Sequence, residues 1–564
     1  MFSLHLKRTM ARDEKRMPRN ELPDASDLVI AAQDDSRGSS TAADMPPADV
    51  LDIMHQSDST INSEQREYDD YVGEDGRYEA PHQSAGFWDP RMAKIRNEVI
   101  FVWARTLITL TTFIIAVLSL YWAVLFHVST NIKNLSVHVV DFDGQVAPYN
   151  NVTPIVGPAV TKTVQQMIDN AATQHTVGWT IASPDPYGGD PIAVRQAVYD
   201  WDFWAAVIIN PNATALLQQA VEIGNASYDP TGAVQFIIMS ARQETNYNSY
   251  IQPQLKILET QFRASFGPSW SQSVVANESL SRDVIAQAPA AVNPGVTPIT
   301  IDLRPFGPAT ATPSVTIGLI YLIIVAFFSF AFFLPIHMKF VTPGNHPPLH
   351  FWQLIVWRLA ATITTYFFVS LAYSLVSLAF QIPFWHPPAS STDVAFNPSA
   401  YGRASFVVYW MVNFVGMNAL GIACENMAMI IGQPWTAAWL IFWVITNVST
   451  AFYSIDLAPG FFKWGYAWPL HHIVQASRQI LFDLHSEIGL NFGVLFAWAA
   501  LNITLFPFVC YLTRWRMERE RRNAERNADS YSVFDAAAEG QKKDVPKEKG
   551  TLPPIRKRGF MRGV

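Results

Sequence analysis

Six runs of about twenty apolar residues constrain the fold of this chain more than any other feature. None of them contains Lys, Arg, Asp or Glu. In the hydrocarbon of a bilayer every backbone amide must be paired within its own segment, so a run of this length predicts a spanning helix. The alternative for any single run is a helix buried in a protein core. We therefore expect an α-helical polytopic membrane protein with six transmembrane helices, at 107–126, 315–336, 359–380, 404–423, 436–455 and 488–512.

Basic residues flank the outermost runs and predict their orientation. Cytosolic segments next to a membrane carry an excess of Lys and Arg. In the 20 residues after the first run, Lys133 is the only basic residue. Both termini are therefore expected in the cytosol, which agrees with six spans, and the first run is expected to be an uncleaved signal anchor. The flanking basic residues are Arg91, Lys94, Arg96 and Arg105 before the first run, and Arg514, Arg516, Arg519, Arg521 and Arg522 after the last.

The distribution of charge divides the chain into five segments. Residues 1–85 are rich in polar residues and predict a disordered cytosolic tail. Residues 86–126 hold a juxtamembrane segment and the first span, and 127–313 form a large domain between the first two spans. Residues 314–513 contain only 5 basic and 5 acidic residues, which excludes a water-soluble fold and predicts a bundle of the remaining five spans. Residues 514–564 form a basic cytosolic tail.

The 127–313 segment alternates β-branched runs with helical periodicity. Strands are expected at 137–142, 177–182, 205–209 and 234–240, and helices at 155–172, 190–199, 214–223 and 245–262. Such alternation predicts an extracytoplasmic α/β domain packed on one sheet.

Glycosylation sequons support a non-cytosolic position for this domain. Five lie within it, and although any one of them could arise by chance, together they predict a glycoprotein. Asn134 lies only eight residues from Phe126, so it is the least accessible of the five. The five asparagines are Asn134, Asn151, Asn212, Asn225 and Asn277.

The segment at about 466–487 is too polar to span. Its apolar residues form one stripe of a helix, and the other side carries Arg478, Asp483, His485 and Glu487. This pattern is typical of a helix lying in the outer membrane interface. The alternative is a helix packed on the outer domain.

Motifs for catalysis are missing from the sequence. It contains no nucleotide-binding Gly-x4-Gly-Lys-Ser/Thr, no Gly-x-Ser-x-Gly and no His-Glu-x-x-His. Two cysteines, Cys424 and Cys510, are too few for a disulfide framework or a cysteine-ligated zinc site. We therefore expect no enzyme activity, no catalytic residues, no cofactor and no metal site. The outer segment has 8 basic and 14 acidic residues, which also argues against nucleic acid as a partner.

Polar residues inside the apolar runs are the candidate functional residues, because they are costly at membrane depth. We expect them to line a transport path, with interhelical amide hydrogen bonds as the alternative for the asparagines. For the glutamate, the alternative is a carboxylate that reaches the cytosolic interface. Arg358, at the start of the third run, is interpreted as an orientation anchor. The candidates are Asn413, Asn418, Glu425, Asn447 and Asn502.

Three stretches resemble a known family: VVDFDG at 139–144, AAVIINPNAT at 205–214, and GYAWPLHHIVQASRQILFDLHSEIGLNFGVLFAW at 465–498. Over roughly 96–516 the chain is similar to the fungal nitrosoguanidine-resistance membrane proteins. That family carries a domain of unknown function related to the permeases of type 2 ABC exporters and to YhgE/Pip-like proteins. The resemblance implies one helix, a large outer domain, five more helices, and a role as an export permease or resistance factor.

The functional hypothesis is export of small amphipathic compounds or lipids by a permease that lacks its own ATPase. The lipid bilayer is the expected partner, and a separate ATPase or a homo-oligomer is left open. The protein is expected in the plasma membrane or another secretory-pathway membrane. One alternative is a non-transporting scaffold or lipid-organising protein whose outer domain binds partners, and a third hypothesis is a membrane enzyme.

Overall fold

The computed structural model describes residues 84–170, 175–341, 346–385, 394, 401–432 and 435–542. Side chains are described as far as 523 and at 525 and 526. The tail expected to be disordered, 1–85, lies outside these residues except for its last two positions. The chain divides into two compact units, Met1–Val102 and Trp103–Val564, and all contacts discussed below lie within the second.

Among the described residues, five helices are long and apolar enough to cross a membrane. They coincide with five of the six predicted spans. The remaining run forms α16 (Thr436–Ala451), an apolar helix of only 16 residues, which rises about 24 Å at 1.5 Å per residue. The five long helices are α2 (Ala93–Ala123), α13 (Ile320–Met338), α14 (Phe351–Ala379), α15 (Ser405–Ile431) and α18 (Ile488–Lys542).

Helix α15 lies at the centre of the bundle, where it contacts α13, α14, α16 and α18. Small residues allow this close packing. A Cβ atom on Gly421 would lie 2.7 Å from the Cβ atom of Ala326 on α13 and would overlap the hydroxyl of Tyr366 on α14. Glycine is therefore required where these three helices meet.

The α/β domain contains a five-stranded mixed sheet in the order β2-β1-β3-β4-β5. The four strands predicted from the sequence are present, and β5 was missed because it has only four residues. Strand β1 pairs in parallel with β2 and β3, β3 pairs antiparallel with β4, and β4 pairs in parallel with β5. The strands are β1 (Ser136–Asp141), β2 (Gly178–Ala182), β3 (Ala205–Ile209), β4 (Val234–Ile238) and β5 (Ile299–Asp302).

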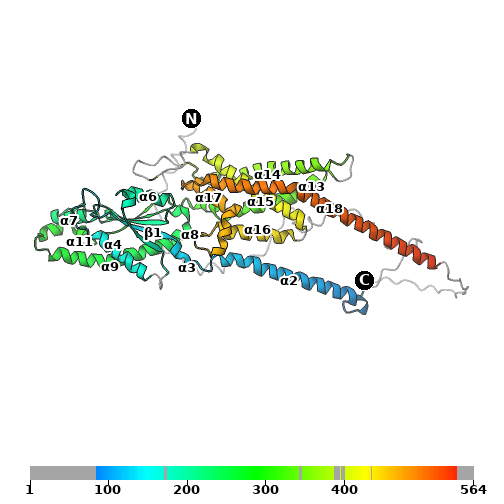
Figure 1. Ribbon diagram of the computed structural model, residues 1–564, viewed down its shortest axis with the longest axis horizontal. Coiled ribbons are helices and arrows are strands. Elements are labelled where there is room, and N and C mark those ends of the chain that lie inside the picture. Colours follow the sequence, from blue (N-terminus) through cyan, green and yellow to red (C-terminus); the bar gives the residue numbers. More distant parts are fainter. Residues whose placement is uncertain are drawn as a thin grey trace, which may run out of the picture. The chain divides into compact units, whose positions relative to one another are not determined.

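Helices pack around this sheet (Figure 1). Side chains of α4 (Val156–Asp169), α7 (Ala213–Ile223) and α9 (Gln252–Ala276) form one buried cluster with Val139 and Val207 of the sheet. The other face lies against α6 (Pro191–Tyr199), in a cluster that continues into the helices of the bundle. Burial of both faces explains why β3 is apolar at every position.

Asp143 connects β1 to two helix N-termini. This fully buried carboxylate accepts hydrogen bonds from the backbone N–H groups of Gly157 (3.0 Å) and Thr214 (2.9 Å), at the starts of α4 and α7. The hydroxyl of Thr214 donates to it as well, at 2.6 Å. A carboxylate satisfies the unpaired N–H groups of a helix start and is favoured there by the helix dipole. The motif VVDFDG therefore has a structural role.

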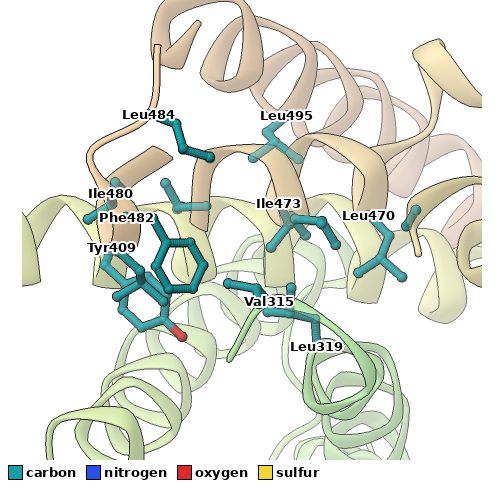
Figure 2. Close-up of a cluster of buried hydrophobic side chains, with 14 of the residues drawn as sticks. Val315, Leu319, Tyr409, Leu470, Ile473, Ile480, Phe482, Leu484 and Leu495 are labelled. Carbon is teal, nitrogen blue, oxygen red and sulfur yellow. The ribbon is translucent and has the colours of Figure 1, made fainter. Parts of the chain in front are cut away.

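Helix α17 (Pro469–Phe482) corresponds to the predicted interfacial helix, but nearly all of its residues are buried. Figure 2 shows its side chains, among them Ile473 and Phe482, gathered with Val315, Leu319 and Tyr409 in one apolar cluster. It contacts α15, α16 and α18 of the bundle and also η6 (Ser240–Arg242) of the α/β domain. The helix therefore differs from an amphipathic helix with a free polar face, because polar side chains such as His472 and Arg478 have partners inside the protein.

Candidate functional site

A cavity of about 510 Å³ lies where the α/β domain meets the ends of α16, α17 and α18. Its walls carry the aromatic rings of Trp201, Trp204, Tyr453 and Tyr466. Small-molecule sites have volumes of about 300–1,000 Å³ and combine apolar walls with a few polar groups. The cavity has both properties, since charged side chains from three parts of the chain also line it.

Arg242 is the cationic group that the α/β domain contributes. It ends η6 (Ser240–Arg242), the turn after β4, and its guanidinium lies 3.9 Å from the ring centre of Trp204 and 5.1 Å from that of Trp201. Its Nη1 donates to the carbonyl of Phe203 at 3.1 Å. Burial lowers the pKa of Arg242 to about 10, against the opposing effect of Asp456 and Glu487, so the group is still cationic at neutral pH.

Two carboxylates face the same cavity. Asp456, which follows α16, accepts a hydrogen bond from the hydroxyl of Tyr466 at 3.3 Å. Glu487, just before α18, is exposed, and its backbone N–H donates to the Gln479 side chain at 3.0 Å. Among the residues that the structure describes, neither carboxylate forms an ion pair, and the same holds for Arg242.

Ion pairs hold the two walls of the cavity together. Arg478 of α17 is almost fully buried and lies 2.7 Å from the carboxylate of Glu244 in the α/β domain. Asp483 ends α17 in the left-handed conformation, at φ 55°, and its carboxylate lies 2.8 Å from Arg304, just beyond β5. The polar side of the predicted amphipathic helix is therefore an interface with the α/β domain.

Two adjacent histidines of α17 complete the lining. The Nδ1 atom of His471 lies 3.0 Å from the carbonyl oxygen of Thr450, and burial together with the neighbouring His472 lowers its pKa to about 4. Both ring nitrogens of His472 lie 2.8 Å from an oxygen, one on Asn491 and one on Tyr466. Within the described parts of the chain, no three His, Cys, Asp or Glu residues are grouped as a metal site would require.

The asparagines predicted to line a transport path lie outside this cavity. Asn413 and Asn418 are buried on α15. The amide of Asn413 donates to the hydroxyl of Ser374 on α14 at 3.0 Å, and that of Asn418 donates to the carbonyl of Phe414 at 2.8 Å. One is an interhelical hydrogen bond and the other lies within α15.

The other two asparagines make contacts within and between helices. Asn447 of α16 accepts a hydrogen bond from the backbone N–H of Leu470 at 3.1 Å, which satisfies the start of α17. The backbone carbonyl of Asn502 on α18 accepts from the amide of Asn426 on α15 at 3.0 Å. These contacts are the interhelical alternative considered for the asparagines, and a place on a transport path stays a prediction.

Glu425 is buried rather than extended to the membrane surface. Its Oε1 lies 2.5 Å from Nη2 of Arg358 on α14, and the two side chains are only 3% and 10% exposed. It also lines a very small cavity, about 10 Å³, with His337 and Tyr366. Arg358, two turns into α14, therefore serves as the counter-ion of Glu425 in addition to preceding the third apolar run.

The sequon asparagines occupy different environments. Asn151, Asn225 and Asn277 are exposed, and Asn212 is partly exposed. Asn134 donates its side-chain amide, the nitrogen that a glycan would modify, to the carbonyl of Asp456 at 2.8 Å. Asn134 is itself exposed, so its lower accessibility, expected from its distance to the first span, stays a prediction, as does modification of all five asparagines.

Sequence reasoning missed Arg242 and its two tryptophans. In the sequence, Arg242 is one of 8 basic residues between 127 and 313, and no motif distinguishes it. Trp201 and Trp204 follow α6 without any apolar periodicity. Only the fold brings these three residues to one cavity with Asp456 and Glu487.

Comparison with known proteins places the chain in a family. Over 528 residues it is 25% identical to an uncharacterized endoplasmic reticulum membrane protein of Saccharomyces cerevisiae, YJR015W, covering 89% of this chain and 93% of the yeast protein. No solved structure matches the chain. The profile of the family described as "Protein of unknown function (DUF3533)" matches residues 106–504, most of the chain. The protein therefore belongs to the DUF3533 family.

Proposed function

We propose that this protein is an export permease that moves small amphipathic compounds or lipids across a secretory-pathway membrane. The observation that carries the proposal is the cavity of about 510 Å³, in which aromatic rings and both signs of charge meet at the ends of membrane helices. A site of this composition accommodates molecules with one polar and one apolar end. The sequence has no ATP-binding motif, so a separate ATPase or another energy source drives the movement.

The proposed topology has six spans and two cytosolic termini, with the short helix α16 as the fifth span in chain order. Two contacts support a crossing by α16. Near its C-terminal end, the carbonyl of Leu457 accepts a hydrogen bond from Asn131, which follows α2. Near its N-terminal end, the carbonyl of Met429 on α15 accepts from Thr513, just before the basic extension of α18. The two ends of α16 thus lie near opposite sides of the membrane.

The name of the yeast relative favours the endoplasmic reticulum as the location. In this orientation the α/β domain lies in the lumen, where Asn151, Asn225 and Asn277 are available for glycosylation. A part in resistance to toxic compounds, and kinship with type 2 ABC permeases, belong to the same proposal and rest on the sequence resemblance.

A lipid-organising protein that does not transport is the second candidate. It is favoured by the interior of the bundle, where the candidate polar residues Asn413, Asn447 and Glu425 are occupied by internal contacts. The cavity at Glu425 is only about 10 Å³, roughly the space of one water molecule. In this second candidate function, the large cavity binds a lipid but does not transport it across the membrane.

Accumulation of labelled amphipathic compounds inside sealed microsomes, with ATP and cytosol supplied, separates the two candidates. Microsomes from cells lacking the protein should accumulate less compound than microsomes with the wild type, and Glu487→Gln in the cavity should resemble the deletion. Glu222→Gln, an exposed position on α7 away from the cavity, is the matched control and should behave as wild type. Equal accumulation in microsomes from all four strains at equal protein levels, across several compound classes, would eliminate export and leave the lipid-organising role.

A further inference from the structure

The large cavity presents charges of both signs that form no direct ion pair in the described parts of the chain, although Asp456 and Glu487 act on Arg242 from a distance. Arg242 stands on the wall formed by the α/β domain, and Asp456 and Glu487 stand on the wall formed by the helix ends. Arg478, which lines the same cavity, differs because Glu244 neutralises it. A ligand with a single charge would leave one of the two walls without a partner, and an unpaired charge at a partly buried site is costly.

The guanidinium of Arg242 is preorganised to bind a phosphate group. Its guanidinium is fixed by the ring of Trp204 at 3.9 Å and by one hydrogen bond to the carbonyl of Phe203, so few of its five N–H donors are used. Arginine offers a planar fork of donors that matches two oxygens of a phosphate group. A guanidinium already oriented by an aromatic ring loses less entropy on binding.

The opposite wall suits an ammonium group. Asp456 and Glu487 supply negative charge, and Tyr453 and Tyr466 supply aromatic faces beside them. Carboxylates and aromatic faces both attract alkylated ammonium groups. The two walls thus match a molecule that carries a phosphate and an ammonium group a short distance apart.

An apolar path leaves the cavity along α18. Leu490 and Val494, four residues apart on one helix face, line the cavity, and Leu490 is 59% exposed. Leu501 and Phe508 continue this face after three and five turns, and both are exposed. A hydrocarbon chain attached to a polar group in the cavity could follow this face into the bilayer.

We infer that the cavity binds the headgroup of a zwitterionic phospholipid, with phosphate at Arg242, ammonium at Asp456 and Glu487, and acyl chains along α18. The inference rests on the proposed function, since it assigns the chemical class of the ligand to the same cavity. A cavity of about 510 Å³ holds the headgroup and glycerol, while the acyl chains remain outside it.

The test is competition between lipids on the purified full-length protein, read by native mass spectrometry from detergent. The protein receives an equimolar mixture of dioleoyl phosphatidylcholine, dioleoyl phosphatidylglycerol and a dioleoyl trimethylammonium lipid. The wild type should carry the phosphatidylcholine adduct in roughly 10-fold excess over each of the others, as expected for one additional charged contact. Equal adducts of all three lipids would overturn the inference without requiring any variant.

Variants test which residues bind the phosphate and which bind the ammonium group of the lipid. Arg242→Gln should remove the preference over the trimethylammonium lipid, and the double variant Asp456→Asn/Glu487→Gln should remove the preference over phosphatidylglycerol. Glu222→Gln should retain both preferences. An unchanged preference in folded Arg242→Gln, judged by an unaltered gel-filtration profile, contradicts the assignment.

Two comparisons separate this inference from related explanations. Excess glycerophosphocholine, which has the headgroup but no acyl chains, should leave the phosphatidylcholine adduct in place, and its displacement would point to a soluble ligand instead. Selective lipid binding together with unchanged compound accumulation would refute the export proposal and leave the headgroup assignment standing. Non-selective binding together with altered accumulation would refute the headgroup assignment and leave the export proposal standing.

Discussion

Replacing Arg358 with Leu should destabilise the membrane bundle, because it leaves Glu425 charged and buried without a partner. The two side chains are 10% and 3% exposed, and the ion pair between α14 and α15 is 2.5 Å long. Thr362 is the other hydrogen-bond donor to Glu425 in the described residues, at the longer distance of 3.3 Å. The carboxylate therefore depends on Arg358 for its stabilisation.

The expected cost is about 3–5 kcal/mol, the usual result of removing one member of a buried ion pair. For a bundle of roughly 200 residues, each kcal/mol lowers the unfolding midpoint by about 2–4 °C, so Arg358→Leu should lower it by roughly 6–20 °C. Glu425→Leu should have an effect of similar size. The double variant should recover most of the loss, because an apolar pair of similar volume often replaces a buried ion pair at little cost.

Thermal unfolding of the detergent-solubilised protein, followed by fluorescence-detected gel filtration at one heating rate, measures all three variants. Arg403→Leu is the matched control, since this arginine is exposed and lies at the start of α15. It should change the free energy of unfolding by no more than about 0.5 kcal/mol. If the double variant is as unstable as the sum of the single ones, the two residues are not coupled and the pairing is wrong.

Three further predictions concern the α/β domain. Asp143→Ala should leave the N–H groups of Gly157 and Thr214 unpaired and destabilise the domain by about 2–4 kcal/mol, seen as faster hydrogen exchange at the starts of α4 and α7. Burial raises the pKa of Asp141 to about 6, above the value of about 3.9 in an unfolded chain. The folded state therefore holds this proton more tightly, and stability should fall as pH rises from about 4 to about 6. Asp141→Asn should flatten that dependence in pH-resolved thermal melts. Finally, Asn151→Gln, Asn225→Gln and Asn277→Gln should each remove an endoglycosidase-sensitive shift in gel mobility, whereas Asn134→Gln should not, because its amide already donates to Asp456.

The sequence alone determined the spanning helices and most of the sheet, because both are governed by local rules. A charge-free run of about twenty residues has to pair its own amides in lipid, and this rule predicted five helices that the structure shows at spanning length. Alternating apolar strands and helices predicted β1 to β4 in the same way. Within the described residues, the short strand β5 and the limited length of α16 escaped these rules.

Only the tertiary structure decided which polar residues meet. Arg358 and Glu425 are 67 residues apart, and Arg478 lies 237 residues from Ala241, whose carbonyl it binds. The predicted interfacial helix is buried for this reason, since the partners of Arg478 and Asp483 come from the α/β domain. The large cavity depends in the same way on Arg242, Asp456 and Glu487, which no spacing in the sequence connects. Electrostatic attraction acts through space, so its pairs are set by the fold that brings distant segments together.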